Sequence, residues 1–210
     1  MVVKMSSSNQ FFMPQKDTKK HTPESTLTAA SRWKIGEVEL VREAFVFNLS
    51  KRRMTAPSGY TGDFYFLESG DWVNVFPITA AGELVLIKQY RPNVQEYFLE
   101  VPGGMLDKTD LDPKLGALRE LREETGYTSN RCESLGPISP NPAIHNNLCH
   151  LYVAFDCEKT ASQDLDPGED IEIVKIPLAD APQLIRSGAL THSLMVAAFL
   201  KLFIRLGTLS

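Results

Sequence analysis

The stretch of sequence that decides the fold reads Arg119-Glu120-Leu121-Arg122-Glu123-Glu124-Thr125-Gly126-Tyr127. It ends a segment that begins at Pro113, where a first helical turn tolerates proline, and that stops at Gly126. Apolar residues recur through it at helical spacing, with one side formed by Leu115, Leu118 and Leu121. We therefore predict a helix over residues 113–125, which places on one shared face the carboxylates of Glu120, Glu123 and Glu124.

The acidic face of this helix has two interpretations. Taken alone, a helix of this composition is usually a solvated face with local ion pairs. The alternative is a cation site, because like charges so placed repel one another, and carboxylate and carbonyl oxygens near phosphates are the ligands that Mg²⁺ prefers. The upstream loop Leu99-Glu100-Val101-Pro102-Gly103-Gly104 favours the cation site, because its paired glycines let the backbone approach a ligand closely.

The loop and the helix together resemble the signature of the Nudix hydrolases, a glycine loop followed by Arg-Glu-U-x-Glu-Glu-x-Gly-U with U apolar or aromatic. Residues 119–127 match this second half at every specified position. The first half differs, because Asp110 stands where the family has glutamate and one extra residue separates Asp110 from Arg119. In the family that glutamate mainly supports the loop, so we expect the difference to affect loop geometry more than metal binding. An inactive copy of the site stays open as an alternative.

Two further elements narrow the resemblance to the ADP-ribose and nucleoside diphosphate sugar branch of the family. Lys88-Gln89-Tyr90-Arg91-Pro92 looks like its Gln-Tyr-Arg-Pro element, and residues 99–104 look like its Leu-Glu-x-Pro-Ala-Gly element. The resemblance implies that Arg91 lies near the diphosphate, which suits a planar guanidinium, and that Glu100 lines the substrate site. The alternatives are a surface arginine and a structural glutamate. Ser139-Pro140-Asn141-Pro142 stands where ADP-ribose hydrolases usually have Ser-Pro-Gly, which weakens ADP-ribose as the particular substrate.

The resemblance also implies a metal site and a general base. Mg²⁺, with Mn²⁺ as the alternative ion, is expected to be held by the carbonyl of Gly103 and by Glu120, Glu123 and Glu124. The acidic turn of residues 164–170 precedes a strand, and in the resembling branch such a loop delivers a carboxylate to the metals or to the attacking water. Glu169 aligns best with that carboxylate, so Glu169 or Glu123 is expected to accept the proton of the water. A merely solvated acidic turn is the alternative.

Composition argues against several other classes of protein. The chain of 210 residues has a formal net charge of -4 and scattered basic residues, so we expect no nucleic-acid partner. Its most apolar stretch, residues 194–204, is about half of the roughly 20 residues that a membrane-spanning helix needs, so we expect no membrane partner. The spacing of the three cysteines indicates small core residues and a reducing compartment, so we expect a cytoplasmic protein; they are Cys132, Cys149 and Cys157.

Three regions follow one another along the chain. Residues 1–31 are rich in Ser, Thr, Lys and Gln and are predicted to be a disordered leader. Residues 32–70 alternate polar and apolar positions, which predicts a small antiparallel sheet. Residues 71–210 form the predicted Nudix domain, with strands at 71–78, 83–87, 148–155 and 171–176 and helices at 113–125, 179–187 and 193–206.

The resemblance implies an α/β fold, an α/β/α sandwich around a mixed β-sheet, preceded by the small N-terminal antiparallel sheet, which in this branch helps to build a homodimer. The expected activity is Mg²⁺-dependent hydrolysis of the pyrophosphate bond of nucleoside diphosphate sugars, ADP-ribose-like or hexose-linked, to a nucleoside monophosphate and a sugar phosphate. Two alternatives stay open. One is a catalytically impaired sensor that binds nucleotide sugars, and the other is a Nudix hydrolase of another nucleoside diphosphate-linked compound.

Overall fold

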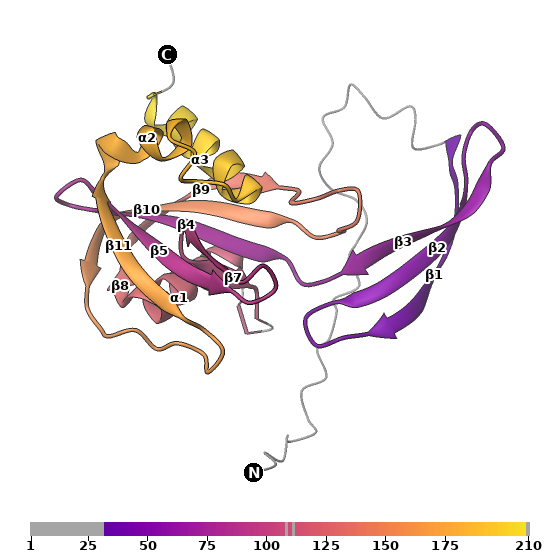
Figure 1. Ribbon diagram of the computed structural model, residues 1–210, viewed down its shortest axis with the longest axis horizontal. Coiled ribbons are helices and arrows are strands. Elements are labelled where there is room, and N and C mark those ends of the chain that lie inside the picture. The colour runs from indigo at the N-terminus through magenta and orange to yellow at the C-terminus, as the bar shows by residue number, and fades with distance from the viewer. Residues whose placement is uncertain (1–31, 108, 111, 209–210) are drawn as a thin grey trace, which may run out of the picture. The chain divides into compact units, whose positions relative to one another are not determined.

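The computed structural model describes residues 32–107, 109–110 and 112–208 (Figure 1). The predicted leader, residues 1–31, lies outside the described residues. The chain forms two compact units. The first holds the strands before Asp71 and the loop Asn141–Asn146, and the second holds the remainder of the described chain.

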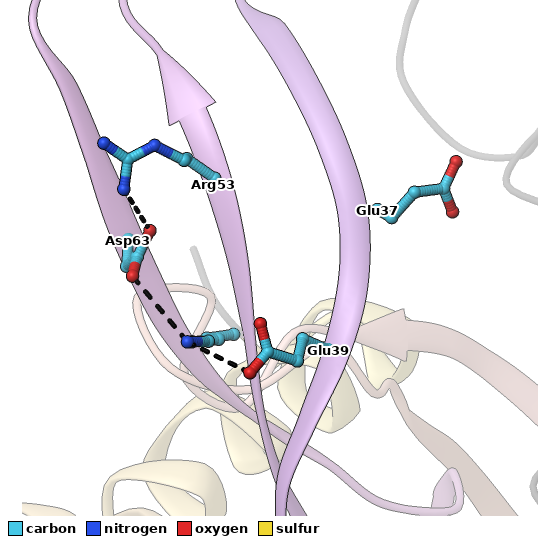
Figure 2. A pocket seen from close by; sticks show the side chains of 5 residues that line it. Glu37, Glu39, Arg53 and Asp63 are labelled. Carbon is cyan, nitrogen blue, oxygen red and sulfur yellow. Dashed lines mark hydrogen bonds and ion pairs between the residues drawn. The ribbon is translucent and has the colours of Figure 1, made fainter.

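The first unit is a three-stranded antiparallel sheet in the order β1-β2-β3. Its strands are β1 (Lys34–Glu43), β2 (Asn48–Thr55) and β3 (Thr61–Glu68), as predicted for this region. Charged side chains form a ladder across one face (Figure 2). Arg53 pairs with Asp63 at 3.0 Å, and Lys51 lies 3.9 Å from Asp63. Lys51 also pairs with Glu39 at 3.1 Å, so the ladder links all three strands and stabilises their pairing.

The second unit is built on a mixed eight-stranded sheet. Its strands are β4 (Trp72–Thr79), β5 (Glu83–Arg91), β6 (Glu96–Glu100), β7 (Gly103–Met105), β8 (Tyr127–Thr128), β9 (Arg131–Ile138), β10 (Cys149–Lys159) and β11 (Ile171–Pro177). The central order is β11-β5-β4-β10-β8, with β6 beside β5, β7 beside β4 and β9 beside β10. β4 and β10 run parallel, whereas the other pairs are antiparallel.

Helices cover both faces of this sheet (Figure 1). They are α1 (Pro113–Thr125) on one face, and η2 (Leu178–Asp180), α2 (Ala181–Arg186) and α3 (Ser193–Leu206) on the other. Alternate residues of β4 contact the two layers: Val73 and Val75 pack in the cluster with α1, and Phe76 and Ile78 in the cluster with α3. The expected α/β/α sandwich is confirmed. No helix in the described ranges has the length and apolar character needed to cross a membrane.

The structure adds β6, β7, β8 and β9 to the predicted strands. β7 contains only Gly103, Gly104 and Met105, and it becomes a strand by pairing with β4 rather than through any β propensity of its own. β6 similarly pairs with the end of β5. The glycine loop of the sequence motif is therefore partly built into the sheet.

Helix α1 has the predicted bounds, and its buried face includes two of the three glutamates. The Leu115 N–H donates to the side chain of Asp112 at 3.0 Å, and Gly126 ends the helix with a φ of 73°. Leu115 is 44% exposed, so the side of the helix that carries the three leucines is not buried along its whole length. The buried residues are Gly116, Ala117, Glu120, Leu121, Glu124 and Thr125. Two carboxylates thus point inward, because β7 presents glycines to that part of the helix and leaves room for them.

Candidate active site

The two buried glutamates of α1 meet strand β7. The Gly103 N–H donates a hydrogen bond to Glu124 Oε2 at 2.7 Å. A Cβ added to Gly104 would lie 2.5 Å from Glu120 Oε1. One added to Gly103 would lie 2.2 Å from the carbonyl oxygen of Val73. Gly103 therefore leaves no room for a side chain against β4, whereas a side chain at position 104 would displace the carboxylate of Glu120.

Burial makes these carboxylates difficult to ionise. It raises the pKa of Glu124 to about 9, with further contributions from the charges of Glu120 and Glu169. Burial also raises the pKa of Glu120 to about 7, and Glu123 and Glu169 add to it. Arg119 opposes the rise at Glu120. A cation placed among these oxygens would lower both pKa values, so the donor set fits a hard divalent ion.

Arg119 organises the acidic face of α1. Its Nη1 donates to Glu120 Oε1 at 3.0 Å and to Glu123 Oε2 at 2.8 Å. Its Nη2 and Nε donate to the two carboxylate oxygens of Asp110 at 3.0 and 3.3 Å. Arg119 therefore ties the loop before α1 to the helix and orients two of the three glutamates.

Asp110 supplies the support that the sequence pattern assigns to a glutamate. Besides Arg119, it accepts a hydrogen bond from the Asp107 N–H at 2.8 Å. Burial opposes its ionisation, but the hydrogen bonds from Arg119 and Asp107 hold the pKa of Asp110 below its usual value. A Cβ on Gly116 would lie 2.9 Å from Asp110 Oδ2, so this carboxylate packs directly on α1. Asp110 therefore reaches both the loop and α1 with the loop length that this chain has.

Arg91 and Glu100 form a bidentate ion pair across β5 and β6. Arg91 Nε donates to Oε1 of Glu100 at 2.8 Å, and Nη2 donates to Oε2 at 2.6 Å. Glu100 is only 3% exposed, and His192 Nδ1 lies 3.6 Å from its Oε2. Burial opposes its charge, but His192 and Arg91 lower the pKa of Glu100 to about 2. Because Arg91 donates to both carboxylate oxygens, Glu100 fixes the orientation of the Arg91 guanidinium.

A cavity of about 480 Å³ connects this pair to the glycine strand. Its lining includes Arg91, Glu100, Gly103 and Gly104, together with residues that sequence reasoning missed: Trp72, Asn74, Phe98 and His192. Asn74 did carry a signal in the sequence, because it is a polar residue inside the apolar run of β4. His192 has no such signal, because it follows α2 and reaches Glu100 only through the tertiary fold.

Glu169 lies in the turn that precedes β11. Its Oε2 accepts a hydrogen bond from the Asp166 N–H at 3.0 Å, and its own N–H donates to the Asp166 carbonyl at 2.9 Å. It contributes to the raised pKa values of Glu120 and Glu124, so its charge is felt at the acidic face of α1. Within the described chain no three His, Cys, Asp or Glu side chains form a ready metal cage. Metal binding would therefore exchange some of the hydrogen bonds now made to these glutamates.

The NUDIX domain model matches residues 70–199. The chain belongs to the Nudix family. This Nudix chain is 31% identical over 163 residues to the methanol dehydrogenase activator of Bacillus methanolicus, covering 77% of the chain and 88% of that protein. It is 28% identical over 143 residues to an ADP-ribose pyrophosphatase of Bacillus subtilis, covering 68% and 77%. It is 29% identical over 175 residues to the ADP-sugar pyrophosphatase of Mus musculus, covering 76% and 80%.

A crystal structure of an ADP compounds hydrolase shares the Nudix fold. Its TM-score to this chain is 0.74 at 24% sequence identity, covering 84% of this chain and 95% of the other. The matches confirm the predicted Nudix family, the α/β fold class and the pyrophosphohydrolase class of enzyme. Two of the named relatives fall in the predicted branch of the family.

Proposed function

We propose that this Nudix enzyme hydrolyses the pyrophosphate bond of nucleoside diphosphate sugars to a nucleoside monophosphate and a sugar phosphate. One observation carries the proposal: Gly103 and Gly104 line the same cavity as Arg91 and also pack on the carboxylates of α1. A diphosphate in the cavity would therefore have a guanidinium and an acidic helix within reach. The names of the ADP-ribose and ADP-sugar pyrophosphatase relatives support an ADP-ribose-like or hexose-linked substrate.

We assign the metal site to Glu120, Glu123, Glu124 and the Gly103 carbonyl, and the ion to Mg²⁺ with Mn²⁺ as the alternative. A bound divalent cation would neutralise the diphosphate and lower the pKa of a coordinated water. The raised pKa values of Glu120 and Glu124 support the assignment, because these carboxylates gain most from a positive charge. Arg119 holds Glu120 and Glu123 in place beforehand.

The remaining roles belong to Arg91, Glu100 and one carboxylate base. Arg91 binds the diphosphate through the guanidinium N–H groups that Glu100 leaves free, and Glu100 fixes its plane. Glu169, or else Glu123, accepts a proton from the attacking water. The oxygen of that water joins one phosphorus, and the bridging oxygen leaves with the other phosphorus. Such a base contributes roughly 10²- to 10⁴-fold to the rate.

We propose further that the chain is a cytoplasmic homodimer that pairs through the first unit. Every residue of β1 is exposed, and the exposed apolar side chains of this unit include Ile35, Leu40, Val41 and Phe45. Apolar surface of this kind, where it is contiguous, marks a protein interface. The free, buried cysteines of the second unit suit a reducing compartment. Light scattering of the purified protein tests the dimer, and a monomer at all concentrations would exclude it.

A phosphatase-coupled assay tests the activity on ADP-ribose, ADP-glucose, GDP-mannose, UDP-glucose and CDP-choline with and without Mg²⁺. We expect metal-dependent release of a nucleoside monophosphate from at least one of them. Glu120→Gln and Glu124→Gln should each lower kcat by roughly 10²-fold or more, because each removes a ligand charge. Glu158→Gln, an exposed change on β10, is the matched control and should keep wild-type activity.

The alternative is a sensor that binds nucleotide sugars without consuming them. One observation supports the sensor: the acidic side chains already accept hydrogen bonds within the protein. Gly103 donates to Glu124, Arg119 donates to Glu123, and the turn that holds Glu169 donates to Glu169 itself. Equilibrium binding without turnover of any of the five compounds would favour the sensor. Turnover that both glutamine variants abolish would exclude it.

A further inference from the structure

The carbonyl groups at the C-terminal end of α1 accept hydrogen bonds from the segment that precedes the turn of Glu169. The last carbonyls of a helix have no partner within the helix and must find one elsewhere. Here the Glu123 carbonyl accepts a hydrogen bond from the Asp164 N–H at 2.8 Å. The Glu124 carbonyl accepts one from the side chain of Gln163, whose Nε2 donates at 2.7 Å. The end of α1 is thus capped by Gln163 and Asp164, which lie a few residues before Glu169 in the chain.

The segment 160–164 runs across the end of α1 as a continuous strap. The N–H groups of Thr160 and Ala161 donate to the Gly126 carbonyl at 2.9 and 3.1 Å. A Cβ on Gly126 would lie 2.1 Å from the Ala161 carbonyl oxygen, so the strap approaches more closely than any other residue there would allow. Figure 1 shows this segment within the connection that leads from β10 to β11.

The other end of the acidic turn is fixed at Asp170. The Tyr90 N–H donates to the Asp170 carbonyl at 3.1 Å, and the Tyr97 hydroxyl donates to Asp170 Oδ2 at 2.6 Å. Gln163 reaches this end as well, because its Nε2 also donates to the Ile171 carbonyl at 3.3 Å. One amide group therefore joins the end of α1 to the start of β11, on either side of the turn that carries Glu169.

We propose that Gln163 is a positioning residue that fixes the separation between Glu169 and the carboxylates of α1. The proposal rests on the proposed function, in which Glu169 is the base. Only residues 164–169 lie between the two anchors, and the turn from Asp166 to Glu169 is closed by its own hydrogen bonds. The turn therefore moves as a unit, and Gln163 sets where that unit sits.

A cap that only stabilises the helix would have a different effect on catalysis. Loss of a contact that only closes the end of a helix lowers the free energy of unfolding and leaves kcat unchanged while the protein is folded. A misplaced base lowers kcat without changing KM, because substrate binding does not use it. A displacement of about 1 Å costs on the order of 10²-fold in rate.

The test compares Gln163→Met, which keeps the length of the side chain but removes both donors, with Gln163→Lys, which restores a donor. We expect Gln163→Met to lower kcat roughly 10- to 100-fold at unchanged KM and unchanged Mg²⁺ requirement. Gln163→Lys should recover most of that loss. Gln183→Met places the same substitution at an exposed position of α2 and should behave as wild type. Wild-type kcat in Gln163→Met would overturn the proposal.

A double variant separates positioning from general damage. In the Glu169→Gln background, Gln163→Met should cause no further loss of kcat, because the base that it positions is already gone. If the fold-loss of kcat in the double variant equals the product of the two single-variant losses, the proposal is overturned. Full activity of Glu169→Gln alone would also overturn it.

Amide hydrogen exchange gives a readout that needs no turnover. Gln163→Met should speed exchange at residues 164–170 in the metal-free protein while the centre of α1 keeps its protection. If the wild-type enzyme hydrolyses none of the five compounds, the proposed function fails, and exchange alone still decides the anchoring: faster exchange supports it, and unchanged exchange overturns it.

Discussion

At the scale of single residues, Glu100 shows how partners make a buried charge tolerable. The carboxylate lies almost entirely out of solvent, where an unpaired charge would cost several kcal/mol. Arg91 donates two hydrogen bonds to it, and His192 lies beside it from the start of α3. The sequence motif predicts Arg91 and Glu100 as separate substrate contacts, whereas the structure joins them into one group that presents a fixed guanidinium to the cavity.

This pair predicts a particular loss of stability in acid. The pKa of Glu100 is about 2 in the folded chain and 4.5 as the ordinary value. Its stabilising effect is therefore complete above about pH 4.5 and is lost as the pH falls toward 2. We expect a contribution on the order of 2 kcal/mol, after allowance for the exposed side of Arg91, in urea unfolding measured from pH 7 to pH 3.

Glu100→Gln should lower the free energy of unfolding at pH 7 and flatten its fall between pH 4.5 and pH 3. Glu96→Gln lies on the exposed end of the same strand and should follow the wild-type curve. Identical pH slopes in wild type and Glu100→Gln would contradict the assignment of the low pKa to this pair.

At the scale of elements, the contact between β7 and α1 decides where the carboxylates point. The sequence predicts α1 to the residue, because Pro113 and Gly126 are strong local signals. It does not predict β7, because three residues with two glycines have little strand propensity until β4 pairs with them. Nor does it predict the exposure of Leu115, because the rotation of the helix depends on what the sheet offers it.

The two glycines of β7 should respond differently to alanine. In Gly103→Ala the new Cβ meets the backbone carbonyl of Val73, which cannot move aside, so we expect a loss of about 2 kcal/mol or more in stability. In Gly104→Ala it meets the end of the Glu120 side chain, which can rotate. That protein should fold normally but need several-fold more Mg²⁺ for half-maximal activity.

Thermal unfolding and Mg²⁺ titration separate the two effects. Gly168→Ala, where a Cβ meets open space, is the control for stability. A stable Gly103→Ala protein, or a Gly104→Ala protein with an unchanged Mg²⁺ requirement, would show that β7 tolerates side chains and does not set the carboxylates.

At the scale of the whole molecule, the site draws on parts of the chain that carry no local signal for it. Motifs identify Glu120, Glu123, Glu124, Arg91 and Glu100, because these residues stand in recognisable spacing. His192 reaches Glu100, and Gln163 reaches the end of α1, only when α3 and β11 have packed on the sheet. Each makes contacts with residues far away in the sequence, and such contacts leave no pattern in a single chain.

The three cysteines test how completely the core of the second unit is closed. All are free and buried, and burial raises the pKa of Cys132 to about 11 and those of Cys149 and Cys157 to about 12. Because the thiolate is the reactive form, we expect almost no reaction with a disulfide reagent at pH 8 in the native protein. Three thiols should react after unfolding in urea, and fast labelling of the native chain would show that the core opens.

The parallel pairing of β4 with β10 also affects how the chain folds during its synthesis. Trp72 lies opposite Cys149, and β5, although it pairs with β4 and β6 early, gains its third neighbour, β11, only at Ile171. During synthesis, β4 and β5 leave the ribosome long before β10 and β11 are made. Their apolar side chains therefore stay exposed to solvent until those strands can pair with them. Closure of such distant contacts is slow. A chaperone that shields β4 and β5 in the nascent chain would therefore raise the yield of folded enzyme without touching its active site.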